Sequence, residues 1–163
     1  MLAEILIMKR NINIEYGYFE TEKGLSSEQI KLVKKAEEAC QSAYAPYSEF
    51  KVGAAVLLDN GEIVLGNNQE NAAYPSGLCA ERVALFAAKS IYPDAQVILL
   101  AIVSDGDLID KDQFLTPCGA CRQVMAEVQN RQNNTFQITL KNPDGSFIVF
   151  EKVDDLLPLI FGK

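Results

Sequence analysis

Two short cysteine motifs are the part of the sequence best suited to chemistry. One is Cys79-Ala80-Glu81, and the other is Pro117-Cys118-Gly119-Ala120-Cys121. Three thiolates can hold one Zn²⁺ and leave the fourth tetrahedral position open, which is typical of a catalytic rather than a structural zinc site. A water in that position is acidified towards neutral pH. We therefore predict that Cys79, Cys118 and Cys121 bind one zinc ion per subunit.

Glu81 is the candidate catalytic residue. It follows Cys79 by two positions, so it can address a water on the metal without serving as a ligand. A carboxylate there can take the proton of the water, pass it to a ring nitrogen and later protonate the leaving amine. A Cys or His with Glu two residues later, followed by Pro-Cys-x-x-Cys, is the signature of zinc-dependent deaminases. The motifs therefore predict hydrolytic deamination.

The charge of such a site has to be offset. Three thiolates on one Zn²⁺ leave a net charge of about −1, which is costly to bury. Both motifs are expected at helix starts, where the backbone supplies partial positive charge and lowers thiol pKa values. Arg82 and Arg122 directly follow the two motifs. Either of them can donate hydrogen bonds to the metal-bound sulfurs.

Composition excludes several other kinds of site. The 163 residues include four cysteines and no histidine, which rules out Ser-His-Asp catalysis, Cys-His catalysis and every zinc site with a histidine ligand. The formal charge of −7 disfavours nucleic acid as a partner, because phosphates require Lys and Arg. The structural alternative is a closed zinc site with Cys40 as fourth ligand. We interpret Cys40 instead as a buried inert thiol, because it lies in mid-helix among apolar residues.

Length and hydropathy indicate one globular domain. No apolar run approaches the roughly 20 residues that a membrane span needs, so no membrane partner is expected. Residues 1–8 are apolar but lack the basic leading stretch and cleavage site of a signal peptide. We expect a cytoplasmic protein whose clustered cysteines bind metal rather than form disulfides.

The pattern of apolar residues predicts an α/β fold, with a mixed sheet of about five strands. Ser26 and Gln29 have the spacing of a capping box, which predicts a helix start, and an Asn-Gly dipeptide at residues 60–61 indicates a hairpin. Residues 1–24 form an extension in which Ile12, Ile14, Tyr16 and Tyr18 alternate with polar residues, so a strand added to a sheet edge is expected there. Strands are predicted at 51–58, 62–66, 96–103, 136–140 and 146–150, and helices at 26–44, 78–90, 119–129 and 154–157.

The cysteine motifs lie within longer runs that closely resemble the short, homotetrameric cytidine deaminases. The resemblance covers residues 26–162 and rests on runs 44–55, 68–75, 77–82, 116–124 and 156–158. It implies a three-layer α-β-α sandwich and a single catalytic domain at residues 25–163. It also implies a homotetramer that deaminates cytidine and 2′-deoxycytidine with zinc.

The same resemblance implies roles in substrate binding. Asn68 and Glu70 match a pair that binds the ribose 3′-hydroxyl, and Phe50 matches an aromatic residue that packs on the pyrimidine. The backbone of Ala80 matches a contact with the base edge. Phe161 matches an aromatic residue that a neighbouring subunit contributes to the pocket.

Two further residues have counterparts in the family. Arg82 matches the residue that donates to the ligand thiolates, and Tyr74 matches a contact between subunits. The sequence departs from the family pattern at Asn67, Gln69 and Lys51, at the short tail after Phe161, and in its N-terminal extension.

Three alternative functions remain at the level of sequence. A blasticidin-type or other small aminopyrimidine nucleoside is the main alternative substrate, although Phe50, Asn68 and Glu70 favour cytidine. A polynucleotide deaminase is disfavoured by the acidic charge. The non-enzyme alternative is a zinc-stabilised binding module.

Overall fold

The expected hairpin forms one side of a mixed sheet. The computed structural model describes residues 8–162, and in it β2 (Lys51–Leu58) and β3 (Ile63–Asn67) pair in antiparallel fashion. Gly61 in the turn between them has a φ of 85°, a conformation that glycine adopts without strain. The Asn-Gly signal therefore fixes the register of the two strands.

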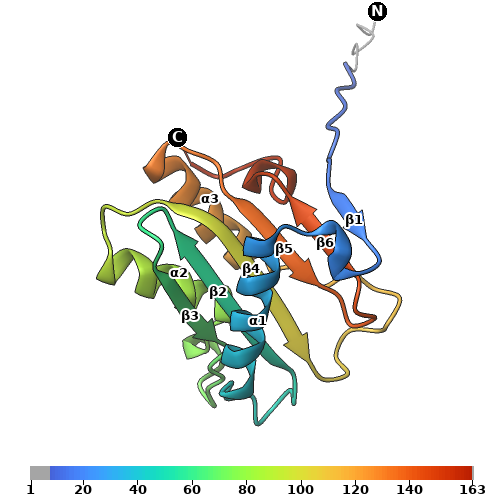
Figure 1. Ribbon diagram of the computed structural model, residues 1–163, viewed down its shortest axis with the longest axis vertical. Coiled ribbons are helices and arrows are strands. Elements are labelled where there is room, and N and C mark those ends of the chain that lie inside the picture. The colour runs from blue at the N-terminus through green and yellow to red at the C-terminus, as the bar shows by residue number, and fades with distance from the viewer. Residues whose placement is uncertain (1–7, 163) are drawn as a thin grey trace, which may run out of the picture.

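The sheet contains six strands, in the order β1-β6-β5-β4-β2-β3 (Figure 1). β4 (Val97–Asp105) runs antiparallel to β2 and parallel to β5 (Gln137–Lys141), which pairs with β6 (Phe147–Phe150). The expected mixed sheet is confirmed, but the expected count of about five was one too few. The sixth strand is β1 (Gly17–Phe19), which pairs with β6 at the outer edge.

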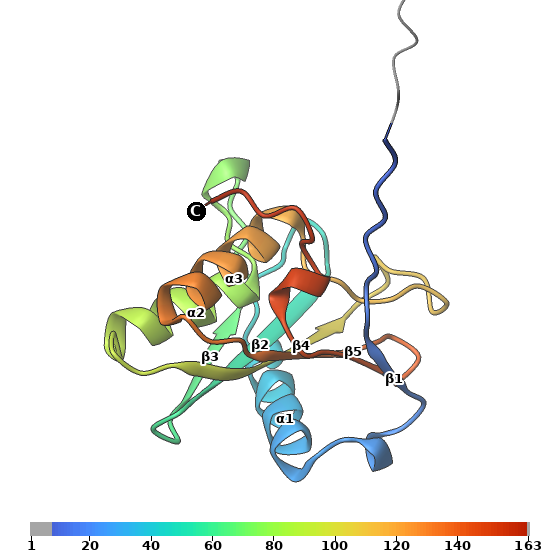
Figure 2. The same ribbon diagram turned by 90° about the horizontal axis from the view of Figure 1, so that it is seen from above.

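Helices cover both faces of the sheet, which confirms the three-layer sandwich (Figure 2). α1 (Ser27–Gln41) lies on one face, and α2 (Ala80–Ile91) and α3 (Gly119–Gln132) lie on the other. α1 begins with the expected capping box, in which the Ser26 side chain accepts from the Gln29 backbone and the Gln29 side chain accepts from Ser26.

Two glycines bring helices unusually close to the sheet. A Cβ on Gly53 of β2 would lie 2.0 Å from the Ala36 carbonyl oxygen of α1. A Cβ on Gly66 of β3 would lie 2.4 Å from the Ala84 nitrogen of α2. Each helix therefore sits at a depth that only glycine permits in the strand below it.

Several expected boundaries differ from those of the structure. α1 ends at Gln41 rather than near residue 44, because the Tyr44 backbone leaves the helix to donate to the Asn68 carbonyl oxygen. The alternation through residues 12–18 gives a strand only at Gly17–Phe19, and the helix expected at 154–157 is a single 3-10 turn, Val153–Asp155. Within residues 8–162, no helix is long and apolar enough to cross a membrane.

Candidate active site

α2 and α3 begin at the same end of the sheet, and each begins with a cysteine. Cys79 is the N-cap residue of α2, and Cys118 is the N-cap residue of α3. The chain reaches α2 from the end of β3 and reaches α3 after β4. These two strand ends lie on either side of the start of β2, because Asn67 of β3 pairs with Gly53 and Asp105 of β4 pairs with Lys51. The topology thus brings together two motifs that are 39 residues apart.

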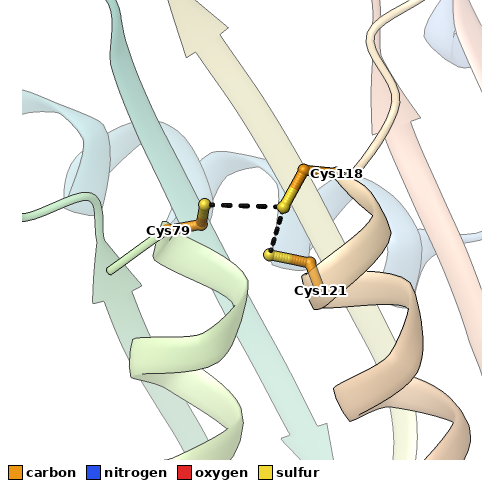
Figure 3. Close-up of side chains that lie close together, drawn as sticks. All are labelled: Cys79, Cys118 and Cys121. Atoms are coloured by element: carbon orange, nitrogen blue, oxygen red, sulfur yellow. Dashed lines mark hydrogen bonds between the residues drawn. The ribbon is translucent and has the colours of Figure 1, made fainter. Parts of the chain in front are cut away.

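The three predicted ligands converge (Figure 3). The Sγ atoms of Cys79 and Cys118 lie 3.8 Å apart, those of Cys118 and Cys121 lie 3.4 Å apart, and all three lie within 4.8 Å of one another. Sulfurs that share a tetrahedral zinc at 2.3 Å are separated by about 3.8 Å. The cluster is therefore compatible with one zinc ion.

The two arginines that follow the cysteine motifs donate to different kinds of group, one to a sulfur and the other to backbone carbonyls. Arg82 donates through Nη2 to Cys79 Sγ at 3.8 Å. Arg122 instead donates to the carbonyl oxygens of Pro117 at 2.8 Å and Leu156 at 3.0 Å. The sequence left both arginines open as donors to the sulfurs, and the structure gives such a bond to Arg82 alone among the described residues.

The electrostatics of the cluster favour a thiolate at Cys79. The neighbouring Cys121 thiol, and then the Arg82 guanidinium, lower the pKa of Cys79 to about 5. The pKa of Cys121 is raised in turn, first by its hydrogen bond to Cys79 and then by burial. A thiolate is the form that binds a metal, so Cys79 is prepared for ligation.

Glu81 lies in the first turn of α2 and is only 4 % exposed. Burial raises the pKa of Glu81 to about 7. Within the described residues its Oε2 atom has no hydrogen-bond partner, although it is buried. A buried acceptor beside three thiols fits a site that takes up a further group, since native proteins rarely leave such atoms unpaired.

Cys40 takes no part in this cluster. It is 3 % exposed and packs with α1 residues in the core on the opposite face of the sheet from α2 and α3. Burial is the main cause of its raised thiol pKa. The structure therefore supports an inert thiol and gives no support to Cys40 as a fourth ligand.

The residues expected to bind substrate lie around the same end of the sheet. Asn68, Glu70, Cys79 and Arg82 line one cavity of about 350 Å³. Phe50 is 8 % exposed and belongs to the core that also contains Ala80. The Asn68 side-chain amide bonds to the backbone at the start of β2. Its Nδ2 donates to Phe50 O at 2.9 Å, and its Oδ1 accepts from Val52 N at 2.8 Å. One amide hydrogen and one lone pair of Asn68 remain for a ligand.

Ser48 is a residue of this site that the sequence did not single out. Its hydroxyl donates to Glu70 Oε1 at 2.5 Å and accepts from the Phe50 backbone N–H at 3.1 Å. The sequence signal that could have identified Ser48 was its position between Tyr47 and Phe50, within the first run that resembles the family (residues 44–55).

The two aromatic residues assigned to subunit contacts are highly exposed in the single chain. Tyr74 is 91 % exposed and Phe161 is 85 % exposed. The Phe161 carbonyl oxygen accepts from Gln123 Nε2 at 2.7 Å, so the tail is attached to the first turn of α3. Within one chain, Phe161 therefore does not pack into the core.

The sequence of the whole region matches a known family. Residues 26–136 match the family model described as the cytidine and deoxycytidylate deaminase zinc-binding region, which is more than half of the chain. The chain belongs to the cytidine and deoxycytidylate deaminase family. The family membership that the motifs predicted is thus confirmed.

Individual relatives of this deaminase support the assignment. It is 41 % identical to a cytidine deaminase of Sporosarcina psychrophila, over 82 % of this chain and 90 % of that protein. It is 47 % identical to the Halalkalibacterium halodurans cytidine deaminase over 60 % of this chain and 69 % of that protein. The crystal structure of the Burkholderia pseudomallei cytidine deaminase matches with a TM-score of 0.69 and 38 % identity, covering 81 % of this chain and 98 % of that one.

Two departures from the family pattern, Asn67 and Gln69, are hydrogen-bonded to each other and to α1. Asn67 Nδ2 donates to the Ala39 carbonyl oxygen of α1 at 3.0 Å, and Gln69 Nε2 donates to Asn67 Oδ1 at 2.5 Å. Asn68 and Glu70 bond to the segment of residues 47–52 instead. The unusual Gln69 side chain therefore bonds to Asn67, which is itself bonded to α1, and not to Asn68 or Glu70.

Proposed function

We propose that this protein hydrolyses cytidine and 2′-deoxycytidine to uridine and 2′-deoxyuridine, with ammonia as the other product. The single observation that carries this proposal is the convergence of three cysteine sulfurs beside the buried Glu81 carboxylate. Family membership supports the same reaction, since relatives of 41 % and 47 % identity are named cytidine deaminase.

Cys79, Cys118 and Cys121 would hold the zinc ion. When bound, zinc supplies a Lewis acid that makes a water acidic enough to react at neutral pH. Arg82 stabilises the negative charge of the Cys79 thiolate, and the N-termini of α2 and α3 add partial positive charge at Cys79 and Cys118.

Glu81 would move the protons. Its carboxylate accepts one proton from the attacking water and transfers it to the ring nitrogen of cytosine, then accepts the remaining proton of the added hydroxyl group and transfers it to the amino group that leaves. A group that does both jobs works best with a pKa near the operating pH, and burial raises the pKa of Glu81 to about 7. The side chain is 4 % exposed, so bulk water has little access to it.

The nucleoside would be held at both ends. Asn68 and Glu70 bind the ribose 3′-hydroxyl, for which the amide and the carboxylate have free hydrogen-bonding capacity. Phe50 packs on the pyrimidine, and the backbone of Ala80 meets the base edge. The lining of one cavity by Asn68, Glu70 and Cys79 supports this placement.

We further propose a homotetramer in which Phe161 of one subunit completes the pocket of another and Tyr74 lies in a contact between subunits. Their exposures of 85 % and 91 % in the single chain support this, because exposed aromatic side chains mark interaction surfaces. Residues 25–163 form the catalytic domain. The cytoplasm is its expected compartment, because thiols that ligate zinc have to stay reduced.

One experiment tests the reaction and the metal together. Purified protein is analysed for zinc per chain, and cytidine loss is followed by ultraviolet absorbance. We expect one zinc per chain and steady turnover of cytidine and 2′-deoxycytidine. Parallel assays use blasticidin S and a cytosine-containing single-stranded oligonucleotide, and faster turnover of either one would replace the proposed substrate. Zinc without any turnover would indicate a binding module.

A further inference from the structure

A single hydroxyl group connects Glu70 and Phe50, the residues expected at the sugar and at the base. Ser48 Oγ donates to Glu70 Oε1 at 2.5 Å and accepts from the Phe50 backbone N–H at 3.1 Å. Glu70 is expected at the ribose and Phe50 at the pyrimidine. Both bonds use the one oxygen, so the positions of these two residues depend on each other.

Within residues 8–162, the Glu70 carboxylate is otherwise held by the backbone N–H groups of Tyr47 and Ser48. Its Oε2 atom accepts from the N–H of Tyr47 at 2.8 Å and of Ser48 at 3.3 Å. Oε1 has the Ser48 hydroxyl as its one donor among the described residues. A carboxylate offers about four lone-pair positions, so one on Oε1 remains for a substrate hydroxyl. The Ser48 hydroxyl therefore determines where that remaining position points.

The turn that carries Ser48 is itself fixed by the backbone. Glu49 has a φ of 55°, and its N–H donates to the Ala45 carbonyl oxygen at 3.1 Å. Gly106, just after β4, leaves room for this turn, because a Cβ there would lie 2.6 Å from the Glu49 carbonyl oxygen. On the far side, the Phe50 carbonyl oxygen accepts from Asn68 Nδ2 at 2.9 Å. Phe50 is thus held at its N–H by Ser48 and at its carbonyl by Asn68.

We propose that Ser48 is a positioning residue that fixes Glu70 relative to Phe50, and so couples recognition of the ribose 3′-hydroxyl to packing on the base. This inference rests on the proposed function, because it assigns Glu70 to the sugar and Phe50 to the pyrimidine. Among the described residues, Ser48 has no hydrogen bond to the metal ligands or to Glu81, so its contribution belongs to substrate binding rather than to proton transfer.

The test compares Ser48→Ala with wild type on cytidine and on 3′-deoxycytidine. For cytidine we expect KM to rise about tenfold, the effect of losing a hydrogen bond to a charged group, with kcat and zinc content nearly unchanged. For 3′-deoxycytidine the rise should be much smaller, because the hydroxyl that Glu70 would bind is missing. Ser48→Thr keeps the hydroxyl and should restore most of the affinity.

Ser90→Ala is the matched control, because Ser90 is exposed at the end of α2 and far from the cavity along that helix. An unchanged KM in Ser48→Ala would overturn the inference, and so would an equal rise for both nucleosides. Loss of kcat with a lowered Tm would also overturn it, since Ser48 would then act on folding. If wild type itself fails to deaminate cytidine, the proposed function is what fails.

Discussion

At the scale of single residues, the site depends on groups that are costly to bury alone. Glu81 is 4 % exposed and its Oε2 atom has no partner among the described residues. Three thiols that lie within 4.8 Å of one another repel each other once ionised. A divalent cation relieves both problems, which is why metal binding and stability are expected to be linked.

Replacing Glu81 with Gln should separate chemistry from folding. Gln is nearly the same size but cannot accept and return a proton. We expect kcat on cytidine to fall by about a thousandfold or more, while zinc per chain and Tm remain at or above the wild-type values. Turnover, metal content and thermal unfolding are measured on the same preparation. Substantial residual kcat would show that another group moves the proton.

Replacing Cys118 with Ala should remove the metal and lower stability together. Losing a ligand held at a thousand times its Kd lowers the free energy of unfolding by roughly 4 kcal/mol. Cys40→Ala is the matched control, because Cys40 is buried in the other core. It should cost about 1 kcal/mol and keep full zinc. Stoichiometric zinc in Cys118→Ala would contradict the ligand assignment.

At the scale of elements, the depth at which α2 sits on β3 determines where Cys79 and Glu81 lie. Cys79 is the N-cap residue of α2, and Glu81 lies in its first turn. Gly66 faces that helix, and a Cβ there would lie 2.5 Å from the Ala80 carbonyl oxygen. A backbone contact of that kind cannot be relieved by turning a side chain.

Gly66→Ala should therefore displace the start of α2. Overpacking of this kind usually costs about 1–3 kcal/mol, and we expect weaker zinc binding in the fraction that folds. Leu65→Ala serves as the control, because Leu65 is 40 % exposed on the same strand. Chemical denaturation gives the stability and a competing chelator gives the zinc affinity. Equal zinc affinity in both variants would argue against this link.

The elements were more predictable than their connections. Capping residues, the Asn-Gly turn and the apolar runs are local signals, and they placed α1, the β2–β3 hairpin and β4 within a few residues. The two arginines show the limit of such signals. Arg82 and Arg122 both directly follow a ligand cysteine, but only Arg122 meets the C-terminal segment, where it donates to the Leu156 carbonyl oxygen.

The hydrogen bonds that Ser48 and Asn68 make within the chain could not be predicted from the sequence for the same reason. Each makes hydrogen bonds to partners brought near by pairing of distant segments.

The alternation at residues 12–18 predicted a longer edge strand than the one that forms. β6 has four residues, so an edge strand beside it has few partners, and only Gly17–Phe19 pair.

At the scale of the whole molecule, the N-terminal extension adds an edge to the sheet. β1 pairs with β6, and the ring of Tyr16 lies 5.7 Å from that of Phe150 and 6.1 Å from that of Phe114. These contacts cover a strand whose backbone groups would otherwise be open to another chain. The described part of the extension, residues 8–24, makes no hydrogen bond to the three clustered cysteines.

Deleting residues 1–24 should thus leave the chemistry and affect the edge. We expect a lower Tm and more aggregation, because β6 becomes the outermost strand and Phe150 loses its cover. Zinc per chain and kcat per folded molecule should remain at wild-type values. Light scattering, thermal unfolding and the cytidine assay provide the comparison. A large loss of kcat would place the extension within the catalytic unit.

The hairpin turn at residues 59–61 lies at the opposite end of the sheet from the starts of α2 and α3. A Cβ on Gly61 would have no neighbour within 4 Å, so the turn is open on its outer side. The molecule can accordingly be immobilised through this turn. A short peptide handle inserted after Asn60 would anchor the protein to a sensor surface while its metal-binding end faces the nucleoside solution.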